Sequence, residues 1–308
     1  MKNKIDFFCI GAQKAATSWL YKRLDELPDF SMPYIKELHF FDRSIKYPSP
    51  NKWSRSLITR ILDFDLLSNS VHELASSLYR FNFKKTRWML KWHFSHINDD
   101  WYLSLFKNLN QITGDITPAY SILEVNDIKK MHKLSPDAKI VFVIRNPIDR
   151  SLSHLNFFHQ TRGKSINELS IDEIKLFLNS KNQTLRSDYL QTLNNYSKVF
   201  KPANILVGFY DAIVENPHDF LNDVVAFLGA NKNQTSYLNI NDKINVSKKN
   251  IIDSEIIDFV TKKYTSDIKR LSKIFGGYCS KWENKLDNKK QNIQLYNSVT
   301  LDKIKLRK

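Results

Sequence analysis

The stretch that decides the fold is Ile10-Gly11-Ala12-Gln13-Lys14-Ala15-Ala16-Thr17-Ser18-Trp19-Leu20. An apolar run over residues 5–10 leads into it and predicts a buried strand. From Thr17 onward, large apolar residues recur at helical spacing until Pro28, which predicts a helix. A loop that leaves a strand and enters a helix presents free backbone N–H groups and the positive end of the helix dipole. The stretch therefore predicts an anion site, to which Lys14 adds a full positive charge.

Two further strand–helix units follow along the chain. Residues 139–145 and 204–210 are apolar runs, and helical patterns cover residues 185–200, 220–228 and 254–275. Strands that alternate with helices indicate a parallel sheet covered on both faces. We therefore predict an α/β fold, a single P-loop-like domain with a central parallel β-sheet flanked by helices. Prolines, scattered aromatic residues and a basic run at about 46–112 predict a helical insertion on that sheet.

The charge of the chain calls for an anionic partner. Its 308 residues include 47 Lys and Arg against 32 Asp and Glu, a formal net charge of +15. Such a surplus favours nucleic acid, an anionic membrane, a phosphorylated nucleotide or an acidic polysaccharide. The only cysteines, Cys9 and Cys279, have no C-x-x-C partner, which excludes a disulfide scaffold. Without a signal peptide or a long apolar segment, we expect a soluble cytoplasmic protein.

Several familiar motifs are absent from this sequence. The loop around Lys14 does not have the G-x-x-x-x-G-K-[ST] spacing of nucleotide triphosphatases, and no dinucleotide fingerprint or G-x-S-x-G elbow occurs. His93 and His96 have no carboxylate or cysteine cluster beside them, so we expect no metal site.

The segment Gln13–Leu20 resembles the 5′-phosphosulfate loop of sulfotransferases that use 3′-phosphoadenosine 5′-phosphosulfate (PAPS). This family often has glycine where Ala16 stands, a departure that alanine tolerates if its φ stays negative. The resemblance implies that the loop binds PAPS through Gln13, Lys14, Ala15, Ala16, Thr17, Ser18 and Trp19.

A second segment, Val141 to Ser153, resembles the family's 3′-phosphate site. The resemblance implies that Arg145, at the end of a strand, and Ser153, about two helical turns on, bind that phosphate. Ligands of open α/β sheets sit at this edge, and a guanidinium grips a phosphate bidentately. Arg150 fits the pattern too, but we expect it to be a structural partner of Asp149 or of a helix carbonyl. The stretch Leu185–Tyr189 resembles the one whose tyrosine lies near the adenine, which implies that Tyr189 contacts the donor.

The segment Lys36–Asp42 resembles the one that carries the catalytic glutamate in the heparan sulfate branch of the family. The resemblance implies that Glu37 is the general base and that Lys14 stabilises the leaving phosphate oxygen. If the segment is extended, His39 points to the same face as Glu37 and orients it or the acceptor, or acts as the base itself. Asp42 contacts the acceptor or caps a turn.

Plainer structural roles remain open for the same residues. Glu37 could form an ion pair with Lys36 or Lys46. His39 could pack beside the two phenylalanines that follow it.

Two more stretches extend the resemblance. Gly114–Tyr120 resembles the substrate-side loop of the same branch, with Ile116 where some eukaryotic members have lysine, and Gly277–Trp282 resembles the family's C-terminal ending. We therefore place a sulfotransferase domain at 1–283 and expect residues 284–308 to form a loosely attached basic tail.

The activity implied is transfer of the sulfuryl group of PAPS to a hydroxyl of a carbohydrate, acidic carbohydrates included, or of another polar acceptor, with 3′-phosphoadenosine 5′-phosphate (PAP) as product and without metal. A P-loop-like nucleotide kinase or phosphotransferase is the alternative. It requires a Mg²⁺-binding carboxylate after an apolar strand, and we identify none. A nucleic-acid or membrane binder would use the basic tail with the basic and aromatic residues of the insertion, although no nucleic-acid module is recognisable. These are Lys84, Lys85, Arg87, Trp88, Lys91 and Trp92.

Overall fold

The computed structural model describes residues 5–49, 64–106, 111–232, 252–287 and 293–304, together with residues 235, 238 and 240. Its centre is a five-stranded sheet in the order β2-β1-β3-β4-β5. Four neighbouring strands are parallel and β5 joins the edge antiparallel to β4. The strands are β1 (Phe7–Gly11), β2 (Gly114–Ile116), β3 (Lys139–Ile144), β4 (Ile205–Phe209) and β5 (Ser298–Thr300).

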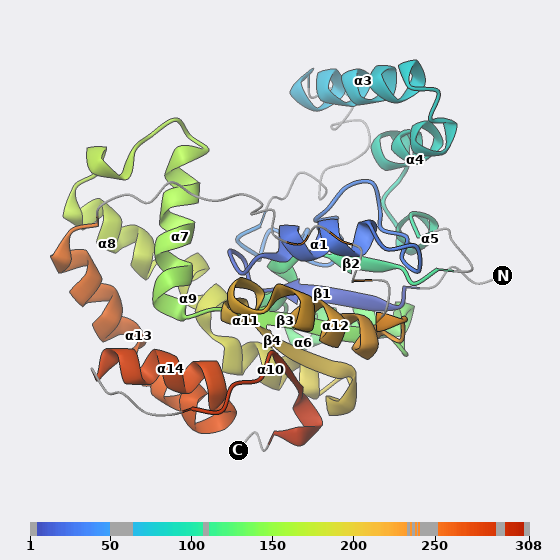
Figure 1. The fold of residues 1–308 in the computed structure, drawn as a ribbon. Coiled ribbons are helices and arrows are strands. Elements are labelled where there is room, and N and C mark those ends of the chain that lie inside the picture. Colours follow the sequence, from blue (N-terminus) through green and yellow to red (C-terminus); the bar gives the residue numbers. More distant parts are fainter. Residues whose placement is uncertain are drawn as a thin grey trace.

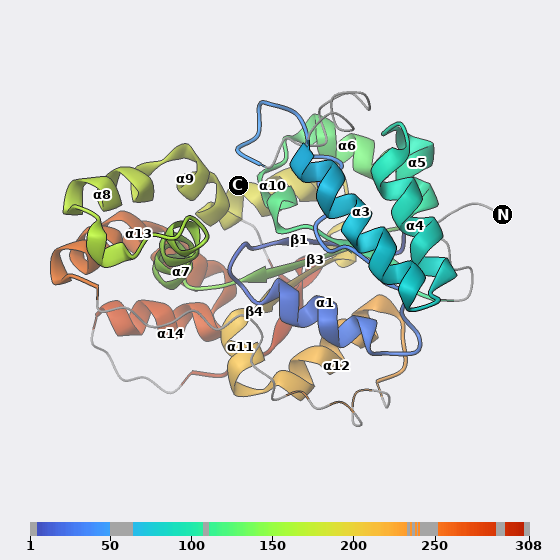
Figure 2. The same ribbon diagram turned by 90° about the horizontal axis from the view of Figure 1, so that it is seen from above.

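Helices cover the sheet on both faces, as Figure 2 shows, with α1 and α12 on one side and α6 and α10 on the other. Beyond the carboxyl ends of the parallel strands lie α7, α8, α9, α13 and α14 (Figure 1). In chain order the helices described are α1 (Thr17–Asp25), α3 (Phe64–Tyr79), α4 (Phe83–Phe94), α5 (Asp99–Ser104), α6 (Val125–Leu134), α7 (Pro147–Gln160), α8 (Ile171–Asn179), α9 (Lys181–Ser187), α10 (Tyr189–Ser197), α11 (Tyr210–Glu215), α12 (Pro217–Leu228), α13 (Ser254–Phe275) and α14 (Gly277–Leu286).

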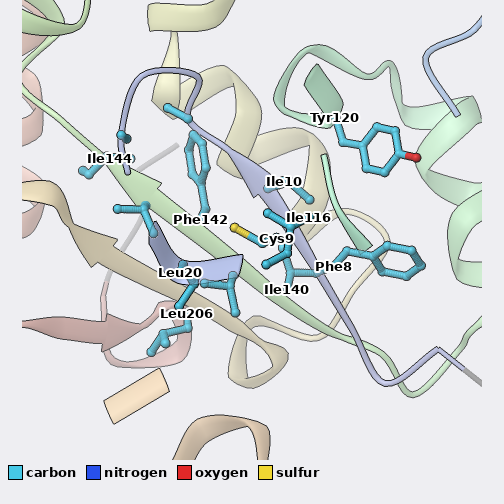
Figure 3. Close-up of a cluster of buried hydrophobic side chains, with 14 of the residues drawn as sticks. Phe8, Cys9, Ile10, Leu20, Ile116, Tyr120, Ile140, Phe142, Ile144 and Leu206 are labelled. Carbon is cyan, nitrogen blue, oxygen red and sulfur yellow. The ribbon is translucent and has the colours of Figure 1, made fainter. Parts of the chain in front are cut away.

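The core lies around β1 and β3, whose side chains are shielded on both faces. All five residues of β1 are buried, and so are five of the six of β3. Figure 3 shows Phe8 and Ile10 of β1 with Phe142 of β3 and Leu20 of α1 in this cluster. Near-continuous apolar runs are what strands of a doubly covered parallel sheet require. The predicted α/β class, its central sheet and its flanking helices are confirmed.

Two short strands were not expected from the sequence. β2 lies within the stretch that resembles a loop, and Gly114 admits the ring of Phe7: a Cβ there would come 2.2 Å from Phe7 Cε1. β5 lies within the predicted tail. Because Ser298–Thr300 pairs with β4 and Leu301 is buried, loose attachment is wrong for residues 298–304.

The predicted insertion contains α3, α4 and α5, which stand beyond α1 in Figure 1. One of its links to the sheet is a buried hydrogen bond, 2.7 Å long, from the Tyr102 hydroxyl of α5 to the Asp115 carboxylate of β2. No helix in the part of the chain that the structure describes combines the length and the apolar character needed to cross a bilayer.

Candidate functional site

The loop between β1 and α1 is shaped to hold an anion. Gly11 has a φ of 146°, and a Cβ there would lie 3.1 Å from the Pro118 carbonyl oxygen, so the turn requires glycine. α1 begins after Ala16 without a side-chain cap. Its first N–H groups therefore remain available to a ligand at the positive end of the helix dipole.

Two residues of this loop adopt the left-handed conformation, Lys14 with a φ of 69° and Ala16 with a φ of 60°. The condition that Ala16 keeps a negative φ is therefore wrong. Left-handed backbone strains a residue with a Cβ, and such strain persists where the surrounding structure demands it. In this chain alanine occupies a conformation that glycine adopts without that cost.

Lys14 and Arg145 meet across the carboxyl edge of the sheet. Nη1 of Arg145 donates a hydrogen bond of 2.8 Å to the Lys14 carbonyl oxygen. The Arg145 guanidinium stacks on the ring of Tyr210, 4.2 Å from its centroid, and the Lys14 ammonium lies at the same distance over Phe157. Burial and the charge of Arg145 lower the pKa of Lys14 to about 8, against a smaller opposing effect of Glu37. Among the described residues, no carboxylate lies directly between these two cations.

Two polar atoms near this edge are buried and lack a partner in the described structure: Nε of Arg145 and Oε1 of Gln13. Buried polar groups are nearly always paired, so each is a point at which a bound ligand can complete the structure. PAPS carries phosphate at both its 3′ and 5′ positions. The unpaired Nε of Arg145, the uncapped start of α1 and the Lys14 charge fit such a donor.

The remaining predicted donor residues differ in what they can offer. Ser153 is half-buried on the second turn of α7, and Ser18 is half-buried on the first turn of α1. Tyr189 is buried and donates a hydrogen bond of 2.8 Å to the Arg145 carbonyl oxygen, so it supports the strand end. Trp19 packs against Phe220 in the core, which leaves only its backbone for a ligand. Ala15 and Thr17 are buried beside them.

The turn that carries Glu37 is anchored to the edge of the sheet. The Glu37 N–H donates to the Ile116 carbonyl oxygen of β2 at 3.2 Å. Leu38, Phe40 and Phe41 are buried, and Phe40 stacks on Tyr102 with ring centroids 4.2 Å apart. The apolar side chains fix the turn, whereas the Glu37 side chain stays 39 % exposed.

Within this turn, Glu37, His39 and Asp42 form a relay. Nε2 of His39 lies 3.6 Å from Oε2 of Glu37, and Nδ1 of His39 lies 2.7 Å from Oδ2 of Asp42. Both Glu37 and His39 have a positive φ, so the segment is not extended. An extended segment was the condition under which we expected the two side chains to share a face. The turn brings the two side chains together by another route, and Asp42 accepts a second hydrogen bond from Ser49.

The charges of the relay stabilise one another. Burial alone would lower the pKa of His39, but its hydrogen bonds to Asp42 and Glu37 raise it to about 9. Burial alone would raise the pKa of Glu37, but the hydrogen bond to His39 and the charge of Lys36 lower it to about 2. At neutral pH, His39 is therefore a cation that donates a hydrogen bond to Asp42 and forms an ion pair with Glu37.

Lys36 forms the ion pair with Glu37 that the sequence left open, whereas Lys46 pairs instead with Glu124 and Asp127. Glu37 is thus both ion-paired and partly exposed.

Arg150 is structural, but not through Asp149, which is exposed. Its guanidinium is buried and donates to the Ser187 and Ser151 hydroxyls at 2.9 Å and 3.0 Å, and to the Gln183 side chain. It therefore ties α7 to α9.

The substrate-side loop expected at Gly114–Tyr120 is largely internal. Asp115 is buried and accepts hydrogen bonds from the hydroxyls of Tyr102, Thr117 and Tyr120, each within 2.8 Å. The Tyr120 hydroxyl in turn accepts the N–H of Phe40 at 3.0 Å. Asp115 is thus the centre of a network that holds the Glu37 turn, and its carboxylate is already used.

Sequence reasoning did not single out Arg186. This α9 side chain is almost fully buried, and its Nη1 has no partner in the described structure. Its other nitrogens donate to the Asn182 side chain and the Pro48 carbonyl oxygen. Burial and the charge of Arg150 lower its pKa to about 10, while Asp42 and Glu37 act in the opposite direction. The one sequence feature that pointed to Arg186 is that it lies within Leu185–Tyr189, the stretch that resembles a donor-binding segment of the family.

The described residues contain no group of three or more His, Cys, Asp or Glu side chains suited to a metal ion.

Three comparisons relate this chain to known proteins. The model of a family described as the sulfotransferase family matches residues 6–234. Heparan sulfate glucosamine 3-O-sulfotransferase 6 of Mus musculus is 28% identical over 137 residues, which cover 42% of this chain and 39% of that protein. Its Homo sapiens counterpart is 36% identical over 67 residues, which cover 21% of this chain and 18% of that protein. The chain thus matches less than half the length of these relatives.

Solved structures are similar over a longer span. A sulfotransferase from Alicyclobacillus acidocaldarius superposes with a TM-score of 0.58 and 21% identity, over 87% of this chain and 94% of that one. The sulfotransferase domain of the Synechococcus PCC 7002 olefin synthase gives a TM-score of 0.50 and 16% identity, over 84% and 88% of the two chains. At these identities the likeness establishes the fold, and the family match over most of the sequence establishes the kinship. The chain belongs to the sulfotransferase family.

Proposed function

We propose that this protein transfers the sulfuryl group of PAPS to a hydroxyl group of an acceptor by in-line displacement. The observation that carries the proposal is the arrangement at one edge of the sheet. Lys14 and Arg145 form a cationic pair there, and the charge of Glu37 acts on Lys14. A strongly anionic donor and a neutral hydroxyl acceptor need these two kinds of group.

The donor is held at two points. Arg145 takes the 3′-phosphate through its unpaired Nε, while the uncapped start of α1 takes the 5′ end. Lys14 neutralises the charge that develops on the leaving phosphate oxygen as the bond between sulfur and that oxygen breaks. Its pKa of about 8 leaves it mostly protonated at neutral pH, and an anionic ligand raises that pKa.

Glu37 is the base in this mechanism. As the acceptor oxygen forms its bond to sulfur, the proton of the hydroxyl passes to a Glu37 carboxylate oxygen. A carboxylate with a pKa of about 2 is a weak base while Lys36 holds it. Displacement of the Lys36 ammonium by the acceptor would raise the basicity of Glu37 where the proton is taken up. Asp42 fixes the His39 ring, and the positively charged ring orients the Glu37 carboxylate and stabilises its negative charge.

A carbohydrate is the acceptor we favour. The relatives matched in sequence are named for a reaction on heparan sulfate glucosamine. The cations beside the relay, Lys36 and Arg186, suit an acceptor that bears anionic groups, and Arg186 has one nitrogen to spare in the described structure.

The kinase alternative requires a carboxylate for Mg²⁺ at a strand end. Asp211, two residues after β4, is the nearest match to this requirement. It accepts a hydrogen bond from Trp282 Nε1 at 3.2 Å and is occupied in joining α11 to α14. No specific feature of the site favours phosphoryl transfer.

Label transfer tests the proposal. The protein is incubated with PAPS labelled with ³⁵S and with a carbohydrate fraction of its host, and in parallel with ATP labelled at the γ-phosphate. We expect label from PAPS alone to enter the carbohydrate, and Lys14→Ala to abolish it. Transfer from ATP and not from PAPS would overturn the proposal in favour of the kinase.

A further inference from the structure

The turn between α3 and α4 carries an apolar cluster that faces solvent. We call residues 78–85 the hairpin tip. Within it Tyr79 is 86%, Phe81 79% and Phe83 68% exposed, and Leu78 is also exposed. Single exposed apolar residues are ordinary on a protein surface, but four within six consecutive positions form a patch that marks an interaction site.

The backbone of the tip displays these side chains. Phe81 adopts a φ of 52°, which is rare for a bulky residue, between the last residue of α3 and the Asn82 cap of α4. The turn separates the Phe81 and Phe83 rings from the face of α4 that packs inward. In Figure 1 α3 and α4 lie at the periphery, outside α5 and the sheet.

Positive charge surrounds the apolar patch. Arg80, Lys84 and Lys85 lie in the tip, and Arg87 and Lys91 follow on α4. No Asp or Glu occurs between Glu73 and Asp99. Among the described residues, no carboxylate forms an ion pair with Arg80, Lys84, Lys85 or Arg87. The tip therefore combines exposed apolar rings with cations that no carboxylate of the described residues neutralises.

The tryptophans of the insertion are not part of this surface. Trp88 and Trp92 are buried and stack on each other with centroids 5.5 Å apart, and Trp92 stacks on Trp101 at 5.4 Å. The ring of Trp101 in turn lies beside that of Phe40 in the Glu37 turn, with centroids 6.2 Å apart. These rings cannot stack on nucleic-acid bases. They connect α4 to the turn that holds the relay.

We propose that the hairpin tip docks on a membrane surface that contains anionic phospholipid. The rings of Phe81 and Phe83 enter the boundary between headgroups and acyl chains, with Leu78 and Tyr79 beside them, and Arg80, Lys84 and Lys85 contact the lipid phosphates. Long basic side chains bury their stems at such an interface and keep their charges at the phosphate level. The stacked aromatic rings then hold the membrane in a defined position relative to the Glu37 turn.

Charge argues against the other occupants of this patch. Two copies that met symmetrically through the tip would bring identical basic surfaces together, and like charges at an interface are costly. A nucleic acid would satisfy the cations but would leave the aliphatic Leu78 without an apolar partner.

Flotation of the full chain with lipid vesicles tests the proposal. We expect binding to vesicles of phosphatidylcholine mixed with phosphatidylglycerol, weaker binding to phosphatidylcholine alone, and release at high salt. The double variant Phe81→Ser, Phe83→Ser should reduce partitioning by at least about tenfold, because each ring loses its apolar contact. Lys84→Glu with Lys85→Glu should remove the preference for anionic vesicles.

Matched variants elsewhere serve as controls. Leu176→Ser removes an exposed apolar residue of α8, and Lys129→Glu with Lys133→Glu reverses two exposed charges of α6; both should bind as the unaltered chain does. These side chains are exposed apart from the half-buried Lys85, so the melting temperature should change little. Absence of vesicle binding, equal binding by the tip and control variants, a dimer that the Phe81→Ser, Phe83→Ser variant dissociates, or binding of DNA in place of vesicles would each overturn the proposal.

Discussion

Nη1 of Arg145 donates a hydrogen bond of 2.8 Å to the carbonyl oxygen of Lys14. This bond joins the end of β3 to the loop after β1, two segments more than a hundred residues apart in sequence. It orients the guanidinium while leaving its Nε unpaired in the described structure. One side chain therefore both holds the Lys14 loop and is prepared to receive an anion.

Arg145→Ala should weaken the binding of PAP by roughly tenfold to a hundredfold, because a charge-assisted hydrogen bond is worth about 1.5–3 kcal/mol. Binding of ADP should fall much less, since ADP lacks the 3′-phosphate and loses only the support of the loop. Isothermal titration calorimetry measures both, with Arg270→Ala on α13 as an exposed control. A loss for ADP as large as that for PAP would refute the role of Arg145 in 3′-phosphate recognition.

Glu37→Gln should reduce sulfuryl transfer by about a hundredfold to ten-thousandfold, the range associated with a general base. Glutamine keeps the shape of the side chain and one acceptor oxygen but takes up no proton. Nucleotide binding should persist, and the melting shift produced by PAP measures it. Glu124→Gln, which removes an exposed carboxylate paired with Lys46, is the matched control. Turnover retained in Glu37→Gln would contradict the assignment of Glu37 as the base.

His39 should make stability depend on pH in one direction. Its pKa rises from 6.5 to about 9 on folding, so its contribution is complete below about pH 6.5 and disappears as pH rises through about 9. The difference in unfolding free energy between the unaltered chain and His39→Gln should therefore shrink over this window, by up to about 3 kcal/mol. Urea unfolding at about pH 6 and about pH 9.5 measures it, with His72→Gln as control. A difference that grows with pH would contradict the charged state assigned to His39.

Lys14 should set an alkaline limit on nucleotide binding. Its pKa of about 8 means that it loses its proton above that pH in the free protein. The affinity for PAP should be nearly constant below about pH 8 and then fall, by up to about tenfold per pH unit. Lys14→Arg keeps its charge throughout and should lack this limb. The same limb in Lys14→Arg would assign it to another group.

The main strands were predictable because burial on both faces demands continuous apolar runs, as in Lys139–Ile144. β2 and β5 were not, since three residues carry no periodic signal. Gly114–Ile116 is a strand because Phe7 needs the space above Gly114, and Ser298–Thr300 is one because β4 offers a free edge. Both causes are tertiary contacts with distant residues.

For the site, strand ends and charge led to Lys14 and Arg145, because these are local features of a sequence, whereas Glu37 came only from the resemblance to the sulfotransferase family. The conformation of Ala16 and the burial of Asp115 were not predictable in this way. The first depends on how the loop turns between β1 and α1, and the second on hydroxyl groups from α5 and from the residues that follow β2.

The central claim is that the edge of the sheet around Lys14 and Arg145 is built for a nucleotide with a 3′-phosphate. The measurement that tests it most directly is the melting temperature of the protein with PAP and with ADP at equal concentrations. Ligands that bind only the folded state stabilise it in proportion to the logarithm of their concentration over Kd. We predict a shift with PAP that far exceeds the shift with ADP. Equal shifts, or none with PAP, would contradict the account.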